Sequence, residues 1–553
     1  MKITVATLIR KKIESWKVKD VPIFQGGAIM NVLSEIAKSK KIKHYCPYHE
    51  QALSMGVDAY ARINGFGVGL VTSGPGATNL TTGIACSYYD SIPSIYFTGQ
   101  VGQFHITGKR KVRQRGFQES DVVSLLKPVT KFCYQLQNPL EAGYVLDKAY
   151  HIAKSGRPGP VVIDVPFNIQ KSLVDERKLK KFTAKKEKFN QKKLIKKALN
   201  HLNNASKPLV IAGGGLRIGK NVSDFHKFIS KNKLPFVTTW PAQDITESKN
   251  NLYFGSAGRH AHLSATNLAR EANSILTLGV RFSPKVIANN FGKKAKIFAV
   301  DIDNGELNDG LIKPNSKINS SLSHFFKNQN SKPMPFKKEW IEFCKIQKNK
   351  NYRNFSELKK NKIKKYVNPY SFTETLSKLV NDNAILLTDA GANLTFFMQS
   401  FQTKKNQRVI SAWGNSPMGY SVAAGIGAKI AAKNRQVISL IGDGSFLINL
   451  QELQFIKFNK IPLKIVIYDN KVFGNTKIGC RDYKIHSIGN DEKGGYYPPE
   501  VHKIAKAFDI KYFYLKNDIN EKKIINSFLK FKGSSILHLN INKNHELLEH
   551  SVN

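Results

Sequence analysis

The stretch IGDGSFLINLQELQFIKFNKIPLKIVIYDNKVFG, residues 441–474, predicts more of the architecture than any other part of the chain. Its first residue ends an apolar run typical of a buried strand, and Gly-Asp-Gly-Ser then predicts a tight turn. A helical pattern of apolar residues follows, and a second strand is expected at 463–468. Strand, helix and strand form a βαβ unit with parallel strands. Asp443 and Asn470 should therefore lie at the carboxyl ends of two strands, where α/β sheets bind ligands.

The polar groups of these two turns match a metal-bound diphosphate. Asp443 offers a carboxylate, Asn470 an amide oxygen and Val472 a backbone carbonyl, all hard ligands suited to Mg²⁺ or Ca²⁺. The glycines let the backbone approach a phosphate, and the Ser445 amide begins a helix whose N-terminus attracts anions. A plain βα turn with an aspartate N-cap is the alternative for Gly-Asp-Gly alone. The asparagine after a well-formed βαβ unit favours the metal site.

The length and composition of the chain limit its class. With 553 residues it is too long for one hydrophobic core, and we expect about three domains. A hydrophobic content of 41% excludes global disorder. No apolar run is long enough to span a bilayer, and the first residues favour an amphipathic helix over a signal peptide. The five cysteines are scattered, which favours the reducing cytoplasm and argues against zinc. We expect a cytoplasmic protein without a membrane partner.

The formal net charge of +46 admits two interpretations. One is nucleic-acid binding. However, the basic residues are mostly lysines spread over the chain among many asparagines, and no basic stretch with interleaved aromatic residues is evident. We therefore interpret the charge as solvated surface lysine and predict no nucleic-acid partner, although the field would steer anionic substrates.

Four short motifs follow one another in the first part of the chain. They are HEQ at 49–51, TSGPGATN at 72–79, GQV at 99–101 and GFQE at 116–119. Together with the Gly-Asp-Gly-Ser turn and the later asparagine, they resemble the thiamin diphosphate-dependent superfamily of acetolactate synthase, pyruvate oxidase and pyruvate decarboxylase. The resemblance covers nearly the whole chain, and the four motifs have the order found in acetolactate synthases.

This resemblance implies an α/β fold with three doubly wound, Rossmann-like domains that contain mainly parallel sheets. A pyrimidine-binding domain is expected at 1–170, a central domain at 190–330 and a diphosphate-binding domain at 366–545. The Lys/Asn-rich segment between the last two indicates a helical connector covered in solvated charge. The implied cofactors are thiamin diphosphate and Mg²⁺.

Glu50 is the residue that we expect to start the chemistry. In this family a glutamate at the start of that helix bonds N1′ of the aminopyrimidine, which promotes removal of the proton from thiazolium C2. The alternative is a glutamate that only stabilises a helix N-terminus through the dipole, and the neighbouring motifs argue against it. Phe117 and Gln118, which match the acetolactate synthase pattern, complete the predicted catalytic set.

The remaining cofactor contacts are carried over from the motifs that match. Met418 would wedge under the thiazolium and enforce the bent shape of the cofactor, and ordinary packing of a methionine is the alternative reading. Asp443, Asn470 and Val472 are the predicted metal ligands. The predicted cofactor-binding residues are Pro75, Asn79, Gly391, Ala392, Asn393, Pro417, Met418, Gly442, Asp443, Gly444, Ser445, Asn470, Phe473 and Gly474.

The expected central domain leaves FAD binding open. A strand enters a glycine turn at 213–215, and further strands are expected at 275–282 and 297–303. Acetolactate synthases hold FAD in this domain, whereas many members of the superfamily keep it without FAD, and a glycine turn alone is weak evidence for a nucleotide. The acetolactate synthase pattern Arg-Phe-Asp-Asp-Arg is replaced here by Arg281-Phe282-Ser283-Pro284-Lys285.

Three positions near the second-substrate pocket depart from the acetolactate synthase pattern. Besides the altered segment that starts at Arg281, Phe167 replaces a lysine and Gly479 replaces a tryptophan. The loss of a cation and of a large aromatic side chain should widen the pocket and remove a partner for a carboxylate. Arg281 is the cation left in a matching position, so these three residues form the predicted substrate set.

The resemblance implies an enzyme that decarboxylates a small 2-oxo acid, with pyruvate expected, and transfers the acyl carbanion to a carbonyl acceptor, as in acetolactate synthesis. The alternative is a carboligase with a bulkier acceptor, such as a nucleotide-linked keto-sugar of surface polysaccharide synthesis. A non-enzymatic regulatory or nucleic-acid-binding protein has only the net charge in its favour, and Glu50, Asp443 and Asn470 argue against it. The family implies a homodimer or homotetramer, and a regulatory small subunit as partner is left open.

Overall fold

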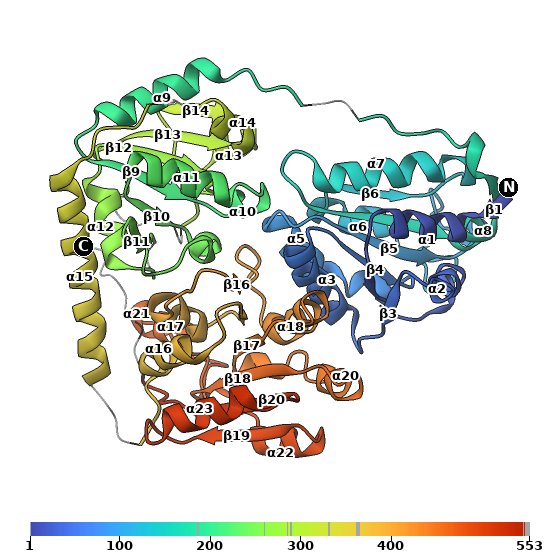
Figure 1. Cartoon of the computed structure of the whole chain (residues 1–553). Helices are drawn as coiled ribbons and strands as arrows, with labels where there is room; N and C mark the ends of the chain where they lie inside the picture. The colour runs from blue at the N-terminus through green and yellow to red at the C-terminus, as the bar shows by residue number, and fades with distance from the viewer. Residues whose placement is uncertain are drawn as a thin grey trace.

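The computed structural model contains three α/β bodies (Figure 1). The first, blue to cyan, lies to one side, while the central body, green to yellow, lies above the third, orange to red. Within the described residues no helix is long and apolar enough to cross a bilayer. The structure describes residues 2–184, 187–258, 260–284, 286–287, 290–329, 332–360, 365–545 and 547, with only the backbone of 351–360.

The central body is built on a sheet of six parallel strands. Their order is β11-β10-β9-β12-β13-β14, so the chain starts in the middle of the sheet and winds outward in both directions, as in dinucleotide-binding folds. The inner strands β9 and β12 are buried along their whole length, as expected where helices cover both faces. The elements are α9 (Lys192–Asn204), β9 (Pro208–Ala212), α10 (Gly215–Ile218), α11 (Val222–Asn232), β10 (Phe236–Thr238), β11 (Tyr253–Ser256), α12 (Leu263–Glu271), β12 (Ser274–Leu278), β13 (Lys296–Asp301), α13 (Asn304–Asp309), β14 (Ser316–Asn319) and α14 (Leu322–Lys327).

The third body has a second six-stranded parallel sheet, in the order β16-β15-β17-β18-β20-β19. The two strands predicted from the stretch 441–474 are β17 and β18, and they pair in parallel. The predicted βαβ unit is therefore confirmed. The elements are α16 (Pro369–Leu379), β15 (Ile385–Thr388), α17 (Ala392–Ser400), β16 (Arg408–Ile410), α18 (Tyr420–Ala431), β17 (Val437–Gly442), α19 (Asp443–Phe446), α20 (Glu452–Phe458), β18 (Leu463–Asp469), α21 (Gly474–Asp482), α22 (Val501–Ala507), β19 (Lys511–Leu515), α23 (Glu521–Lys530) and β20 (Ser535–Asn540).

The first body repeats the strand order of the third. Its parallel sheet β4-β5-β7-β6 is joined through a bridge between Ile23 and Leu70 to the parallel pair β2-β3. The order through the bridge is thus β3-β2-β4-β5-β7-β6. The elements are β1 (Lys2–Thr4), α1 (Val5–Ser15), β2 (Asp20–Pro22), α2 (Met30–Ala37), β3 (Lys43–Tyr45), α3 (Glu50–Asn64), β4 (Gly67–Val71), α4 (Pro75–Thr78), α5 (Thr81–Tyr89), β5 (Ser94–Gln100), α6 (Val122–Leu126), β6 (Phe132–Gln135), α7 (Ala142–Lys154), β7 (Pro160–Pro166), α8 (Phe167–Lys171) and β8 (Leu173–Asp175).

Three bodies built on parallel sheets confirm the predicted fold class. The strand expected at 275–282 is too long, because β12 ends at Leu278 and the next residue, Gly279, has a left-handed φ of +62°. The connector contains α15 (Lys338–Lys360), whose first turn is less solvated than expected. Trp340 is buried there, and its indole N–H donates to the Pro208 carbonyl at 2.7 Å. The connector is therefore attached to the central body.

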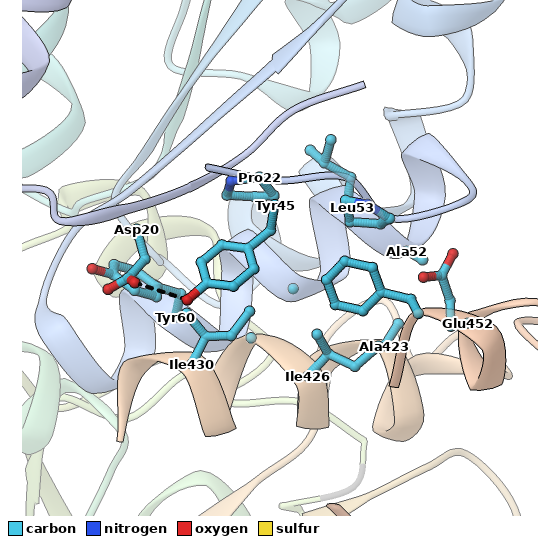
Figure 2. Close-up of a pocket in the computed structure, with 14 residues that line it drawn as sticks. Asp20, Pro22, Tyr45, Ala52, Leu53, Tyr60, Ala423, Ile426, Ile430 and Glu452 are labelled. Atoms are coloured by element: carbon cyan, nitrogen blue, oxygen red, sulfur yellow. Dashed lines mark hydrogen bonds between the residues drawn. The ribbon is translucent and has the colours of Figure 1, made fainter. Parts of the chain in front are cut away.

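Helices α3 and α18 join the first body to the third. They approach so closely at Gly56 and Gly427 that a Cβ atom on Gly427 would lie 2.0 Å from the Gly56 carbonyl oxygen. Figure 2 shows the small apolar pocket beside this contact, with Ile426 and Ile430 of α18 facing residues of the first body. The contact brings the N-terminal end of α3 close to the elements that follow β17.

Candidate active site

The turn after β17 holds Asp443 in a fixed position. Asp443 begins α19 and is 3% exposed. One carboxylate oxygen accepts a hydrogen bond from the Gly444 amide at 2.9 Å, and the other accepts one from the Lys471 amide at 2.9 Å. Since Lys471 follows β18, this carboxylate joins the ends of two neighbouring parallel strands.

A second buried carboxylate, that of Asp469, lies beside Asp443. Asp469 is the last residue of β18, and one of its oxygens is 2.8 Å from Nε2 of His538. Burial, together with the negative charge of Asp469, raises the pKa of Asp443 to about 8. A bound cation would relieve this repulsion. The sequence analysis missed Asp469, although it directly precedes Asn470.

The predicted metal ligands also lie at this edge of the sheet. Oδ1 of Asn470 accepts from the Val472 amide at 3.3 Å, and Val472 is buried. Within the described residues, no group of three His, Cys, Asp or Glu side chains could hold a metal ion. A metal at Asp443 would therefore need the amide and carbonyl oxygens that the prediction includes.

The predicted cofactor residues of three separate segments lie together. The Phe473 ring covers Gly444, where a Cβ atom would come within 2.4 Å of a ring atom. A Cβ atom on Gly474 would lie 3.6 Å from the Cβ of Ala392. Asn393, on the same helix as Ala392, donates to the carbonyl of Leu440 on β17 at 3.3 Å. The structure thus brings together the segments 391–393, 442–445 and 470–474. In the second segment, Gly442 ends β17 and Ser445 is buried.

Asp389, after β15, holds the segment that carries Pro417 and Met418. Its buried carboxylate accepts from the amides of Ala390 and Gly419, each at 2.9 Å. Burial raises the pKa of Asp389 to about 7. The Met418 side chain is 36% exposed, so it is not an ordinary core methionine. The sequence analysis did not single out Asp389, although it lies two residues before Gly391, which was predicted to bind the cofactor.

Glu50 begins α3 and is buried within the first body. It is 6% exposed, and its Oε2 accepts a hydrogen bond from Nδ2 of Asn79 at 3.0 Å. Asn79 follows α4, which begins at the exposed Pro75. Glu50 and Asn79 thus lie in contact, and the Asn79 amide donates to the Pro75 carbonyl at 3.0 Å. In the part of the chain that the structure describes, no hydrogen bond joins Glu50 to the turn at Asp443.

Glu452 on α20 is a site residue that sequence reasoning missed. It is fully buried, and Oε1 accepts from the amide of Tyr48, two residues before Glu50, at 3.0 Å. Burial raises the pKa of Glu452 from 4.5 to about 7. The available signal was a glutamate among apolar helix positions soon after the Gly-Asp-Gly-Ser turn. The contact links the third body to the segment that positions Glu50.

Phe117 and Gln118 lie on the β5–α6 loop, residues 101–121. The Phe117 side chain is 87% exposed, and Gln118 is exposed with a left-handed φ of +59°. The Gln118 carbonyl packs so closely on Gly74 that a Cβ atom there would lie 2.9 Å from the oxygen. The structure therefore places Gln118 beside the turn before α4, and it places the Phe117 side chain outside the core.

No aromatic residue interrupts the basic segment 109–115, but two exposed aromatic side chains flank it, which the sequence analysis did not remark on. Five basic residues at 109–115 lie between Phe104 and Phe117, which are 75% and 87% exposed. The Arg115 guanidinium lies 4.6 Å from the centroid of the Phe104 ring. The pattern was readable in the sequence, but the high lysine content elsewhere concealed it.

Two of the altered substrate positions have different surroundings. Phe167 begins α8, and Nζ of Lys171 lies 4.5 Å from the centroid of its ring, so a cation remains one helical turn from the lost lysine. The spacing of four residues could have predicted this pair. A Cβ atom on Gly479, in α21, would meet no atom within 4 Å, so the site of the lost tryptophan is open.

Arg281 lies where the three bodies meet. A Cβ atom on Gly414 of the third body would lie 3.3 Å from Nη1 of Arg281. The Gly414 amide donates to Asp90 of the first body at 2.8 Å. The residue next to Arg281, Gly414, is four positions before Met418 in the sequence. Lys285, the last residue of the altered segment, lies outside the described residues.

A cavity of about 910 Å³ opens at the same junction. It extends along the central body, where burial raises the pKa of Asp301, at the end of β13, to about 6. Its volume falls in the range of small-molecule and cofactor sites. Its lining includes Gly214, Gly215, Arg217, Arg281, Asp301 and Trp413.

Comparison with known proteins gives matches along the chain. The N-terminal TPP binding domain of thiamine pyrophosphate enzymes matches residues 3–125, the central domain matches 195–319, and the C-terminal TPP binding domain matches 389–539. An acetolactate synthase large subunit of Lactococcus lactis is 31% identical, with 89% of this chain and 85% of that protein covered. A probable acetolactate synthase large subunit of Methanocaldococcus jannaschii is 31% identical, covering 92% and 86%. The large subunit of Porphyra purpurea is 31% identical, covering 94% and 89%.

Proposed function

The chain belongs to the thiamin diphosphate-dependent enzymes that include the acetolactate synthase large subunits, and from this we propose that it decarboxylates pyruvate and transfers the two-carbon unit to a carbonyl acceptor. The observation that carries the proposal is the buried Asp443 carboxylate at the ends of two parallel strands. Around it, the predicted cofactor segments of the third body converge. The chain is an enzyme of the carboligase type.

We propose that Mg²⁺ and the diphosphate are held at this turn. Asp443, Asn470 and the Val472 carbonyl would bind the metal, because all three offer the hard oxygen ligands that it prefers. Gly444 is demanded by the Phe473 ring, which would lie 2.4 Å from a Cβ atom there, so this glycine by itself is not evidence for phosphate. Thiamin diphosphate, when bound, supplies a thiazolium carbon that stabilises the carbanion left by decarboxylation. The buried Glu50 carboxylate would hold the proton at the aminopyrimidine, with Asn79 fixing its orientation.

We also propose that the site is shared between chains. We keep the proposed domains at 1–170, 190–330 and 366–545. The hydrogen bond of Glu50 with Asn79 lies within its own body. In a homodimer, or a homotetramer made of two such dimers, Glu50 of one chain would face Asp443 of another. Mixing Glu50→Gln with Asp443→Ala chains should restore part of the activity, because a mixed dimer has one intact site. An active monomer in analytical ultracentrifugation would contradict the shared site.

A second candidate function is the transfer of the same unit to a bulkier acceptor. It is favoured by the open space at Gly479 and by Phe167 in place of a lysine. A second pyruvate needs a cation for its carboxylate, and Arg281 at the three-body junction is the residue in a matching position. If Arg281 suffices, pyruvate alone gives acetolactate, and Arg281→Ala stops its formation.

Mass spectrometry of the products from pyruvate, alone and with larger carbonyl acceptors, tests both candidates. Slow release of carbon dioxide from pyruvate alone, with turnover raised by a larger acceptor, would support the second. Rapid acetolactate formation with a low Michaelis constant for pyruvate would exclude it. If no 2-oxo acid is decarboxylated by the holoenzyme under any of these conditions, the proposed function is wrong.

The cavity at the three-body junction is where FAD would bind. Its volume suits a nucleotide. The glycine turn is not evidence for FAD, since a Cβ atom on Gly213 would lie 1.9 Å from the Gly279 carbonyl oxygen, so packing alone demands glycine there. The absorbance spectrum of the heat-released supernatant of the purified enzyme decides whether a flavin is present.

The relatives are named large subunits, and we propose on that basis a regulatory small subunit as a partner. Co-purification of a smaller chain with the tagged enzyme would test it. We also propose a cytoplasmic location, because all five cysteines are free and scattered. Fractionation of cells tests the location.

A further inference from the structure

The β5–α6 loop has a charge that the composition of the chain does not explain. Five of the seven residues at 109–115 are basic, and three of them are arginines. Arginine is rare in this chain, with 15 among the 86 basic residues. A general lysine bias would therefore have placed lysines here. Arginine binds phosphate oxygens with two parallel N–H donors, which lysine cannot do.

These cations have no carboxylate partner in the part of the chain that the structure describes. All five are exposed, and among the described residues none forms an ion pair with a carboxylate. Arg110 donates only to the carbonyls of Ile106 and Thr107, at 3.2 and 3.3 Å, and Arg115 lies over the Phe104 ring. An unpaired group of arginines repels itself, so it favours an anion that brings its own negative charge.

The base of the loop is nevertheless ordered. The Glu119 carboxylate accepts from the Thr107 amide, from the Thr107 hydroxyl at 2.7 Å and from the Arg115 amide at 2.9 Å. These bonds tie the two sides of the basic segment together. The cations therefore project from a closed loop whose ends are held by the protein.

The loop lies beside the predicted acceptor side of the site. Gln118, at its end, packs on Gly74 before the helix that leads to Asn79, the partner of Glu50. At its beginning, Gln103 exchanges two hydrogen bonds of 2.8 and 2.9 Å with Asn168, the residue after Phe167. Phe167, which replaces the lysine of the family pattern, thus adjoins a loop that carries five basic residues.

We propose that the arginines of the β5–α6 loop bind the phosphate groups of a phosphate-bearing carbonyl acceptor. This rests on the proposed function and selects, between its two candidates, the bulkier acceptor. The phosphate could belong to a simple phosphate ester or to a nucleoside diphosphate. The exposed Phe104 and Phe117 rings beside the arginines offer apolar faces on which a base could stack.

The test uses the full-length enzyme saturated with thiamin diphosphate and Mg²⁺, so that the diphosphate turn is filled. Calorimetry measures the binding of uridine diphosphate and of inorganic pyrophosphate. The variant Arg110→Gln/Arg113→Gln should weaken binding of the probe at least about tenfold, because charge-assisted hydrogen bonds are lost. Its logarithmic salt dependence should also become shallower. Release of carbon dioxide from pyruvate without an acceptor should be unchanged.

The matched control is Lys196→Gln/Lys197→Gln on α9, which removes the same charge from exposed positions of the central body. It should change binding less than about twofold, since long-range charge effects are screened. If the loop variant weakens the binding of both probes equally, the loop recognises the phosphate groups and not the nucleoside. Tighter binding of uridine diphosphate that Phe104→Ala removes identifies a nucleotide.

The proposal is overturned if neither probe binds, or if the loop variant binds as wild type does. Binding by the loop variant that equals wild-type binding would mean that the probe occupies another place, such as the cavity at the three-body junction. Failure of the proposed function is a separate result, because it is measured as absence of carbon dioxide release from pyruvate in the wild-type enzyme.

Discussion

The turn at Asp443 and the β5–α6 loop both carry polar residues at the edge of a parallel sheet, but they hold them differently. Asp443 is buried, and both carboxylate oxygens accept backbone amides of neighbouring segments. The arginines of the loop are exposed, and Arg110 donates only to two backbone carbonyls of the loop itself. A substitution in the turn should disturb several segments, whereas a substitution of a loop arginine should change the surface and leave the fold intact. The cofactor end of the site is therefore constrained, and the acceptor end can vary.

The largest effect is expected at the constrained end. Asp443→Ala should abolish tight binding of thiamin diphosphate in the presence of Mg²⁺, because the diphosphate loses its bridging cation. Calorimetry with the purified variant measures this. Affinity equal to that of wild type would show that the metal assignment is wrong.

Asp443→Asn is the control that separates binding from folding. The pKa of Asp443 is raised to about 8, so the fold favours the protonated side chain. The stability that this proton contributes is lost as the pH rises through about 8. Without cofactor, the asparagine variant should melt no lower than wild type at pH 8.5, while it too loses the cofactor. A melting temperature well below wild type would mean that the carboxylate is structural.

The second effect concerns Glu50, which is buried but belongs to the first body. Glu50→Gln keeps the shape and the bond to Asn79 while it weakens proton transfer. The cofactor should still bind, and exchange of the thiazolium C2 proton, followed by NMR, should slow by about 100-fold or more. Unchanged exchange would remove Glu50 from the mechanism.

The third effect is on stability and depends on pH. Glu452 has a pKa raised from 4.5 to about 7, so its proton stabilises the fold at low pH, and this contribution is lost as the pH rises from about 5 to above 7. Glu452→Gln keeps an acceptor for the Tyr48 amide and does not titrate. Between pH 5 and 8, the unfolding free energy of wild type should fall relative to the variant by about 1–3 kcal/mol.

Denaturant unfolding at a series of pH values checks this prediction for Glu452. Parallel curves for the two proteins would mean that the carboxyl is already charged at pH 5. A charged Glu452 would accept the hydrogen bond from the Tyr48 amide more strongly than a neutral one.

The smallest effect is expected at the open position in α21. Gly479→Trp meets no atom within 4 Å at its Cβ, so the unfolding free energy should change by less than about 1 kcal/mol. The larger side chain should narrow the pocket and raise the ratio of acetolactate to larger products about tenfold. Product analysis by mass spectrometry measures the ratio.

Gly444→Ala is the matched change at the constrained end. Its Cβ atom would come within 2.4 Å of the Phe473 ring, so we expect a cost of about 1–3 kcal/mol. If the two glycine substitutions lower the unfolding free energy equally in chemical denaturation, Gly444 in the cofactor turn is no more constrained than Gly479 at the acceptor end.

The sequence predicted the fold class well because its signals are local. Each predicted strand is a short apolar run, and each motif is contiguous, so the βαβ unit around Asp443 could be read from a single stretch. The same holds for Glu50 at a helix start. The length of β12 was misjudged, because an apolar run does not reveal that Gly279 turns the chain.

The site residues that were missed depend on contacts between distant segments. Glu452 reaches the Tyr48 amide across about 400 positions of the chain, and Asp389 holds Gly419. Such contacts arise only when packed helices bring the segments together, and no local pattern encodes them.

The sequence by itself determined the order of strands and helices, the family and the residues at the strand ends, because hydrophobic periodicity and turn chemistry act over a few neighbouring positions. The placement of Arg281 against Gly414, and of the basic loop against the residue after Phe167, came from the packing of three bodies on one another. Close packing selects one arrangement among many that the same local elements would allow.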